Sequence, residues 1–248
     1  MIKKQLMQQK VTGELIFGIH PIIELLKAKK RKLISLYTTK PTPKGFDSIE
    51  KLMPKYPVAI QYVSREVLHR MAGTPDHQGI IAWAHTFPYR TKPFTADKHP
   101  YIILLDGVQD PRNVGAILRS AYCTGIQGVI LCKKNGVGIT ATTLKSSAGL
   151  AEHLDIYEAP SAQAAVQELK TAGYHIYITT FNGESAVTMR YNDPLCIVIG
   201  SEGEGVTKQL MSQGTKITLP QKTTDISYNA SVAAGILLFI IGSQKKLI

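Results

Sequence analysis

Apolar residues along the first third of the chain alternate between helical and strand-like spacing. Residues 18–30 place them three and four positions apart, which predicts an amphipathic helix. Short runs of β-branched and aromatic residues predict strands at 33–39, 58–63 and 79–84. We therefore expect a small α/β domain over residues 13–85, preceded by an N-terminal tail of residues 1–12.

The stretch that follows this domain has no hydrophobic periodicity. Pro88, Pro93 and Pro100 interrupt it, and most of its other residues are polar. Prolines among polar residues are typical of loops and linkers. We therefore predict a linker over residues 86–99 and a second domain over residues 100–248.

The second part of the chain reads as strands and helices in alternation. Its predicted strands are apolar throughout, and predicted helices lie between them. Such strands are typical of a parallel sheet covered by helices on both faces, and ligands bind such sheets at the carboxyl ends of the strands. The expected strands are 101–106, 128–132, 174–180, 195–202 and 216–220, and the expected helices are 113–125, 161–173, 206–213 and a last one after residue 229.

Composition supports a folded chain and adds a charge asymmetry. The 248 residues are 44% hydrophobic and 19% charged, with a formal net charge of +11. Residues 1–99 carry 17 Lys and Arg against 7 Asp and Glu, and residues 100–248 carry 12 against 11. A basic first part indicates contact with a polyanion such as RNA, the alternative being a well-solvated surface.

Cysteine usage and hydropathy bear on the cellular compartment. Cys123, Cys132 and Cys196 are too few for a disulfide framework and have no paired metal spacing, so we expect no metal and a reducing compartment. The basic start lacks the apolar core of a secretion signal. The longest apolar run, residues 235–242, is too short to cross a bilayer. We expect a cytoplasmic protein that does not contact membranes.

A first candidate for chemistry lies at residues 104–121, where an apolar strand ends and a polar turn leads into a helix. Asn113 is placed to cap that helix. Arg119 falls on a helix built otherwise from small and apolar residues, so it is either a surface arginine with a buried stem or a functional group.

A second candidate is the glycine-rich stretch at residues 197–206. Gly200, Gly203 and Gly205 would allow the backbone to approach a ligand closely. Glu202 and Glu204 between them would repel phosphates, and the stretch follows a late strand. It is therefore not a dinucleotide fingerprint.

A third candidate follows the strand at 216–220, where a polar loop brings Ser227 and Asn229 to the start of the last helix. One cap needs only one of these residues, so capping alone leaves the other without a role. All three stretches begin where a predicted parallel strand ends. They should therefore meet at one edge of the sheet and build one site.

Taken in order, N-x-G-x-I-x-R-x-A, G-S-E-G-x-G and P-x6-S-x-N-x-S resemble the motifs of the SpoU (TrmH-like) family of RNA ribose 2′-O-methyltransferases. Residues 17–26 and 77–84 resemble the ribosomal-protein-like RNA-binding domain that many members carry. The resemblance implies an α/β catalytic domain with a SPOUT-type trefoil knot. It also implies S-adenosylmethionine as cofactor and a homodimer.

The same resemblance implies roles for individual residues. The chain departs from the family pattern in two places: Tyr228 stands where the third motif has leucine, and Leu219-Pro220-Gln221 stands where Ile-Pro-Met is common. Both departures touch the wall of the implied cofactor site. The implied cofactor-binding residues are Gly200, Leu219 and Tyr228, and the implied catalytic residues are Asn113, Arg119, Glu202, Ser227 and Asn229.

The implied substrate is RNA, and the two-domain layout most resembles members that methylate a guanosine ribose of large-subunit ribosomal RNA. A transfer RNA ribose methyltransferase is the alternative within the family. A non-catalytic RNA-binding module would explain the basic first part but not the three loops. A nucleotide-dependent oxidoreductase would need a glycine-rich turn after an early strand, and residues 106–115 do not provide one.

Overall fold

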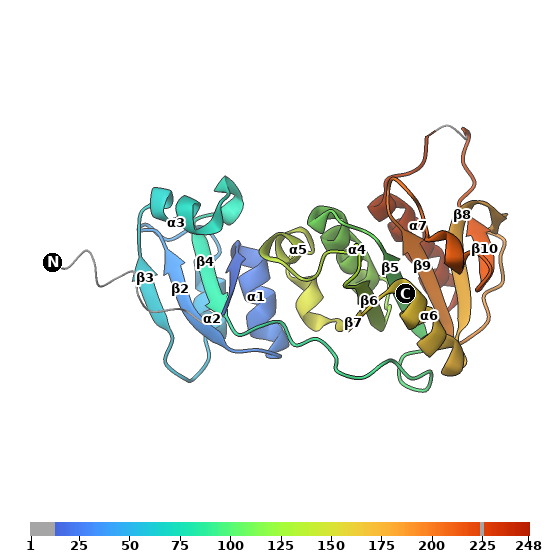
Figure 1. Cartoon of the computed structure of the whole chain (residues 1–248). Helices are drawn as coiled ribbons and strands as arrows, with labels where there is room; N and C mark the ends of the chain where they lie inside the picture. The colour runs from blue at the N-terminus through green and yellow to red at the C-terminus, as the bar shows by residue number, and fades with distance from the viewer. Residues whose placement is uncertain (1–12, 224–225) are drawn as a thin grey trace. The chain divides into compact units, whose positions relative to one another are not determined.

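A computed structural model describes residues 13–223 and 226–248 of the chain (Figure 1). The chain divides into two compact units, with the division between Pro88 and Tyr89. This division falls inside the stretch that we expected to be a linker. The expected N-terminal tail, residues 1–12, and Asp225 of the third motif lie outside the described residues.

The first unit is built on a four-stranded sheet in the order β1-β4-β2-β3. Strand β4 runs antiparallel to both of its neighbours, and β3 runs parallel to β2 at the edge. The three strands predicted from the sequence are β2, β3 and β4. The elements are β1 (Glu14–Phe17), α1 (Ile19–Ala28), β2 (Leu33–Thr38), α2 (Phe46–Leu52), β3 (Ala59–Tyr62), α3 (Arg65–Ala72), η2 (Pro75–His77) and β4 (Ile80–Ala84).

The predicted helix of this unit is α1, whose apolar side chains at helical spacing lie buried; among them are Ile22 and Leu25. Strand β1 and helices α2 and α3 were not predicted. Each has eight residues or fewer, which is too short for a clear periodicity.

The second unit contains a six-stranded sheet in the order β10-β8-β9-β5-β6-β7, and every pairing in it is parallel. The predicted parallel α/β architecture is confirmed. The elements are β5 (Tyr101–Asp106), α4 (Pro111–Cys123), β6 (Gly128–Cys132), α5 (Ala141–Ser146), η3 (Leu150–His153), β7 (Asp155–Ala159), α6 (Ala162–Thr171), β8 (His175–Ser185), β9 (Leu195–Gly200), η4 (Lys208–Leu210), β10 (Thr215–Thr218) and α7 (Ala230–Gln244).

Both faces of this sheet are covered. Ile102 and Leu104 of β5 belong to a buried cluster that includes the apolar face of α6. Because side chains alternate along a strand, Ile103 and Leu105 point to the opposite face, and they are equally buried. Helices α4 and α7 pack against each other, and α7 also contacts β9. Two-sided burial explains why the strands read as continuous apolar runs.

The cysteines fit this packing. Cys132 and Cys196 lie in the buried cluster, whereas Cys123 is exposed and all three thiols are free. Burial, with a smaller effect from the Asp106 carboxylate, raises the pKa of the Cys132 thiol to about 12. These two buried thiols therefore fill space in the core and stay protonated.

One predicted helix was wrong. Residues 206–213 form only a single turn of 3-10 helix, η4. The backbone N–H of Thr207 donates to Oδ2 of Asp106, 2.7 Å away at the end of β5. That bond fixes the chain just before the turn, and β10 starts at Thr215, so any helix here is limited to residues 208–214. In the described part of the chain, no helix is long and apolar enough to cross a bilayer.

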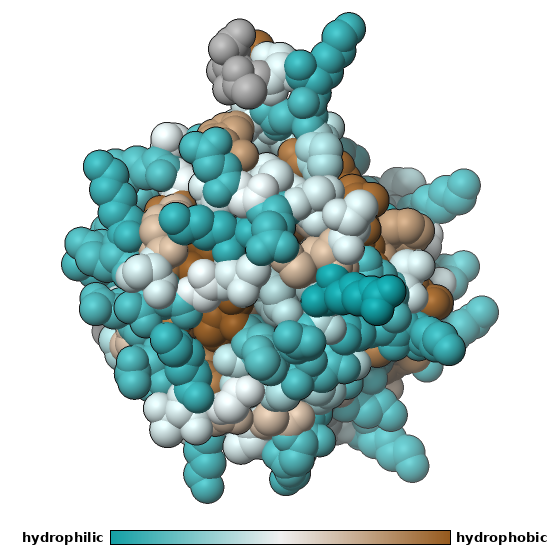
Figure 2. Space-filling model, turned by 90° about the vertical axis from the view of Figure 1, so that its right-hand side faces the viewer, coloured by the Kyte–Doolittle hydropathy of each residue, from teal (hydrophilic) through white to brown (hydrophobic). Residues whose placement is uncertain are grey.

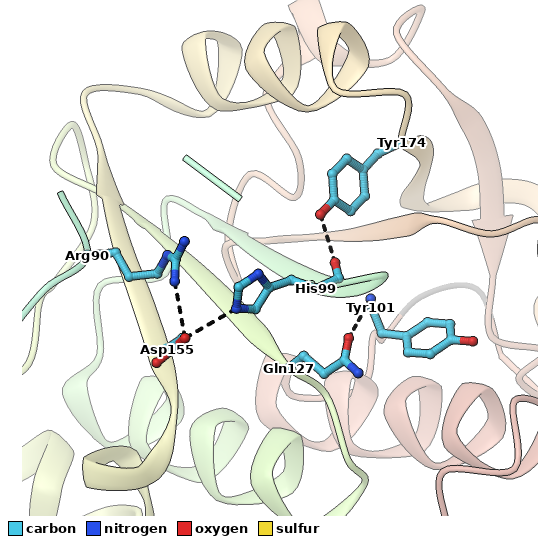
Figure 3. A network of polar contacts seen from close by, with 6 residues as sticks. All are labelled: Arg90, His99, Tyr101, Gln127, Asp155 and Tyr174. Atoms are coloured by element: carbon cyan, nitrogen blue, oxygen red, sulfur yellow. Dashed lines mark hydrogen bonds and ion pairs between the residues drawn. The ribbon is translucent and has the colours of Figure 1, made fainter. Parts of the chain in front are cut away.

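The stretch from Tyr89 onward packs onto the second unit (Figure 3). Arg90 Nη1 and His99 Nε2 each lie 3.2 Å from Asp155 Oδ2, at the start of β7. The Tyr174 hydroxyl donates to the carbonyl of His99 at 2.7 Å. Phe94, which lies between Arg90 and His99 in the sequence, is buried. The prolines of residues 86–99 indicated a linker, but most of this stretch, from Tyr89 onward, belongs to the second unit.

Replacing Asp155 with alanine should therefore lower the free energy of unfolding of the second unit by about 1 kcal/mol. Arg90 and His99 would lose a shared acceptor, and the partly exposed position limits the loss. Urea unfolding would measure the change. Asp155→Asn keeps an oxygen acceptor at the same place and should lose less; an alanine variant as stable as the parent chain would contradict the anchoring role.

Candidate active site

Three loops that are far apart in the sequence begin side by side at the carboxyl edge of the parallel sheet. Asp106 at the end of β5 pairs with Gly200 at the end of β9, so the loops that follow start next to each other. The loops after β9 and β10, together with the middle of β8 and the start of α7, enclose a cavity of about 270 Å³. Its lining comprises Thr179–Phe181, Ile199–Val206, Met211, Ile217–Leu219, Gln221, Ser227, Tyr228, Ala230, Ala233 and Leu237.

The view from the side where β8 and β10 lie shows a mainly hydrophilic surface with separate hydrophobic patches (Figure 2). Phe181 of β8 and Tyr228 are both exposed although they line the cavity. The cavity therefore has aromatic walls that open to solvent, which suits a flat, partly apolar ligand.

Gly200 is required by the close approach of two backbone segments. A Cβ atom at this position would overlap the backbone of Gly205 and Val206. Ser201 and Gly205 bond each other through both N–H and C=O groups at 3.1 Å, so the loop closes tightly on the end of β9. The result is a cradle of backbone groups along one wall of the cavity, and only glycine fits at its base.

Side chains from all three loops meet beside this cavity. The Nδ2 atom of Asn113, in the first turn of α4, donates to Oε1 of Glu202 in the glycine loop. The Nδ2 atom of Asn229, at the start of α7, donates to Oδ1 of Asn113 at 3.2 Å. Asn113 thus connects residues 89 and 116 positions away. We call Asn113, Glu202 and Asn229 the polar bridge.

The expectation that Asn113 caps α4 was wrong. Pro111 is the first helical residue, and the Asp110 side chain accepts from the N–H of Arg112 at 2.8 Å. Proline at the first position needs no N–H partner, so the helix starts earlier than the apolar pattern indicated. Because Asp110 takes the capping role, the Asn113 amide is available for the polar bridge.

Asn229, in contrast, is the cap of α7. Its Oδ1 atom accepts from the backbone N–H groups of Ser231 and Val232 at 2.9 and 3.4 Å. Its amide nitrogen faces Asn113. The oxygen of the Asn229 amide therefore caps the helix, and the nitrogen of the same amide completes the polar bridge.

The other implied site residues of the third stretch also line the cavity: Leu219, Ser227 and Tyr228. Gln221, which also lines it, donates from Nε2 to the carbonyl of Ile226 at 3.0 Å. This bond joins the two sides of the loop before α7. A methionine at position 221 has no N–H to donate, so this departure from the family pattern adds a hydrogen bond within the cavity wall.

Arg119 lies apart from the other candidate residues. It is exposed on α4 and is not part of the cavity lining. Within residues 13–223 and 226–248, no hydrogen bond or ion pair joins it to Asn113 or Glu202, and Glu202 bonds to Asn113 instead. One copy of the chain therefore does not bring Arg119 to the polar bridge.

Sequence reasoning missed two contributions to the site. Thr179, Thr180 and Phe181 in the middle of β8 form part of the lining, and the two threonines that follow an apolar run were the available signal. Asp106 is 7% exposed and holds the glycine loop through Thr207. Its position at the end of an apolar strand was visible in the sequence, but its partner 101 residues away was not.

Asn229 allows its two contacts to be tested separately. Asn229→Asp keeps the capping oxygen and loses the donor to Asn113, whereas Asn229→Ala loses both. We expect the alanine variant to lose about 1 kcal/mol of stability and the aspartate variant almost none. The initial rate of any reaction catalysed at the polar bridge should fall about 10-fold in both variants, and thermal unfolding would measure the changes in stability. Full activity in Asn229→Asp would show that the bond from Asn229 to Asn113 is not needed and that Asn229 acts only as a helix cap.

The described residues hold no cluster of three or more His, Cys, Asp or Glu side chains with the geometry to bind a metal ion. The site that they do form consists of a backbone cradle, apolar walls, neutral amides and the carboxylates of Glu202 and Glu204. It is a site for an organic ligand at the edge of a parallel sheet.

Fold and site together define the second unit as an α/β domain with a cavity suited to a small ligand, preceded in the chain by the basic first unit. The SpoU rRNA Methylase family model matches residues 100–239, and the model for RNA 2′-O ribose methyltransferase substrate binding matches residues 15–90. The chain belongs to the SpoU family. The family predicted from the three motifs is confirmed.

Two curated relatives match over almost their full length. A TrmH family tRNA/rRNA methyltransferase of Bacillus subtilis, YacO, is 33% identical over 240 residues, which cover 93% of this chain and 96% of the relative. The 23S rRNA (guanosine-2′-O-)-methyltransferase RlmB of Shewanella oneidensis is 32% identical, covering 94% and 98%.

Solved structures share the fold of the whole chain. An RNA 2′-O ribose methyltransferase superposes with a TM-score of 0.79 at 21% identity, covering 94% of this chain and 89% of that one. AviRb of Streptomyces viridochromogenes, in complex with the cofactor AdoMet, superposes with a TM-score of 0.77 at 18% identity, covering 96% and 92%. At these identities the likeness establishes the fold.

Proposed function

We propose that this protein transfers a methyl group from S-adenosylmethionine to a ribose 2′-hydroxyl of RNA, specifically a guanosine of large-subunit ribosomal RNA. The observation that carries the proposal is the polar bridge beside the cavity that Gly200 floors. A relative 32% identical over 94% of the chain is named as a 23S rRNA guanosine-2′-O-methyltransferase, which supports the substrate. We further propose that it acts in the cytoplasm, in keeping with its free thiols.

The residues of the cavity fit the cofactor. The backbone cradle at Gly200 offers N–H and C=O groups, and Leu219 and Tyr228 offer apolar and aromatic contact. Gly200, Leu219 and Tyr228 would hold the cofactor there, largely through backbone groups. When bound, S-adenosylmethionine supplies a methyl group on a positively charged sulfur.

The chain's own residues would orient the acceptor and help its hydroxyl to lose a proton. Asn113, Glu202 and Asn229 form a fixed set of amide and carboxylate groups, and Ser227 adds a hydroxyl close by. Arg119 would stabilise the developing alkoxide electrostatically. Because its guanidinium stays protonated, a phosphate of the substrate or a water accepts the proton. Holding both reactants in line supplies much of the rate enhancement.

This role for Arg119 requires a second copy of the chain, and we propose a homodimer. Helix α7 buries one face, yet Val232, Ile236 and Phe239 form an exposed apolar stripe along another face. Phe239 is 61% exposed. Tyr122 is exposed on α4 one turn after Arg119, and α4 packs against α7. An apolar stripe beside an arginine outside the cavity fits an interface that carries Arg119 to the partner's polar bridge.

Sedimentation of Phe239→Lys tests the dimer. We expect this variant to sediment as a monomer and to lose methyl transfer, while Val187→Lys, a change at another exposed apolar residue, leaves the dimer intact. A Phe239→Lys variant that remained a fully active dimer would remove α7 from the interface.

We also propose that the second unit is knotted in the SPOUT manner, with α7 at the end that passes through. Strand β10 lies at the edge of the sheet beside β8, whereas α7 packs on α4 and β9 in its middle. Residues on both sides of position 224 line the same cavity as the glycine loop. Described residues before and after this position therefore contact the cavity of the glycine loop, which supports a threaded end.

Incubation with labelled S-adenosylmethionine and unmodified large-subunit ribosomal RNA tests the proposed reaction. We expect label on one guanosine 2′-oxygen, mapped by its resistance to alkaline cleavage. Label on transfer RNA alone would keep the chemistry and replace the substrate. Binding of RNA without binding of S-adenosylmethionine would turn the protein into an RNA-binding module and contradict the proposal.

A further inference from the structure

The open edge of the first unit carries exposed aromatic rings next to lysines. Strand β3 pairs with β2 alone among the described strands, so its outer side is unpartnered. Tyr62 at the end of β3 is 47% exposed, and Tyr56, three residues before it begins, is 38% exposed. We call Tyr62, Lys40, Tyr56 and Lys32 the β3 edge.

Each of these rings lies close to one ammonium group. Lys40 Nζ lies 4.3 Å from the centre of the Tyr62 ring, and Lys32 Nζ lies 5.9 Å from the centre of the Tyr56 ring. In the described part of the chain, neither lysine forms an ion pair with a carboxylate. The two cations therefore remain available to an external anion.

The two rings are held differently. The Tyr56 hydroxyl accepts from the N–H of Leu33 at 2.9 Å, which fixes that ring near the start of β2. The Tyr62 hydroxyl has no partner among the described residues, and its ring projects from the end of the strand. Tyr62 is thus a half-exposed ring with a cation over one of its faces and no structural bond that requires its hydroxyl.

We infer that the β3 edge binds an unpaired segment of RNA, with a base stacked on Tyr62 and phosphates beside Lys40 and Lys32. This inference rests on the proposed function, which makes RNA the partner of the chain, and it adds the surface and the form of the RNA. An aromatic face can stack only on a base that is not already stacked in a duplex. Lysines provide the charge complementarity to the backbone.

Charge around the edge agrees with this partner. The sequence between Lys40 and Tyr56 contains three lysines and only two acidic residues: Lys44, Lys51 and Lys55 against Asp47 and Glu50. Lysines on an edge strand also prevent pairing with other sheets, but that role does not need exposed tyrosines. Rings and cations together favour a nucleic acid over a protein strand.

Fluorescence anisotropy with the full-length chain provides the test, using a labelled short oligoadenylate and an RNA duplex of equal length. We expect Tyr62→Ala to weaken oligoadenylate binding by about 10-fold, and Tyr62→Phe, which keeps the ring, to stay within about two-fold of the parent chain. Lys40→Ala should lower the slope of log affinity against log salt by about one, whereas Lys170→Ala, an exposed lysine on α6 of the second unit, serves as the control for net charge.

Three results would overturn the inference: no binding of oligoadenylate, Tyr62→Ala binding as tightly as the parent chain, or equal binding of duplex that is insensitive to Tyr62. The affinity for S-adenosylmethionine should not change in any variant, because Tyr62 and the cavity belong to different units. Methylation of ribosomal RNA with an unchanged KM in Tyr62→Ala would retain the proposed function and reject this surface. Binding of oligoadenylate through Tyr62 without any methyl transfer would retain this surface and reject the proposed function.

Discussion

Arg119→Ala is expected to lower the rate of methyl transfer by about 100- to 1,000-fold while the affinity for S-adenosylmethionine changes little. That range is the usual effect of removing one group that stabilises developing negative charge. The cofactor should still bind because Arg119 does not line the cavity. Single-turnover rates and calorimetric binding of the cofactor would measure the two effects separately.

Arg119→Lys is the matched control because it keeps the charge and loses the planar fork. We expect this variant to recover only part of the lost rate. Mixing Arg119→Ala chains with chains that carry Asn113→Ala should restore activity in a fraction of the dimers, if Arg119 serves the partner's site. Near-parent activity of Arg119→Ala would exclude it from the reaction.

Gly200→Ala is expected to abolish detectable cofactor binding and to lower methyl transfer by about 100-fold or more. The added methyl group would overlap the backbone of Gly205 and Val206, and the Ser201–Gly205 pair leaves the loop little freedom to move away. Displacement of the cradle by about 1 Å is enough for a loss of this size. Overpacking should also destabilise the second unit by about 1–3 kcal/mol.

Gly203→Ala is the control for this experiment because a Cβ atom at position 203 meets nothing within 4 Å. It lies in the same loop, so a general effect of changing the loop would appear in both variants. We expect Gly203→Ala to bind cofactor and to unfold like the parent chain. Equal behaviour of the two variants would show that the close approach at Gly200 is not required.

The order of the motifs carried most of the prediction. Strands such as β5 and β9 are buried on both faces, so their apolar runs were visible without any partner. Because parallel strands end at one edge, three polar loops in three places predicted one site. Asn113, Glu202 and Asn229 do lie together at that edge.

Short elements and capping were less predictable. β1, α2 and α3 are too short to show a period, and the helix expected at 206–213 reduced to one turn. A cap depends on which side chain reaches which N–H, and Asp110 rather than Asn113 occupies that place in α4. The linker prediction rested on prolines, yet Phe94 is buried in the second unit.

The sequence by itself determined the two-part layout, the parallel sheet and the family, because hydrophobic pattern and motif order are local properties of the chain. Tertiary structure alone decided which polar atoms meet: Asn113 bonds to Glu202 and Asn229, and Asp106 holds Thr207. It also left Arg119 outside the cavity of its own chain. Those contacts join residues about a hundred positions apart, and only the packing of loops at the sheet edge brings such residues within bonding distance.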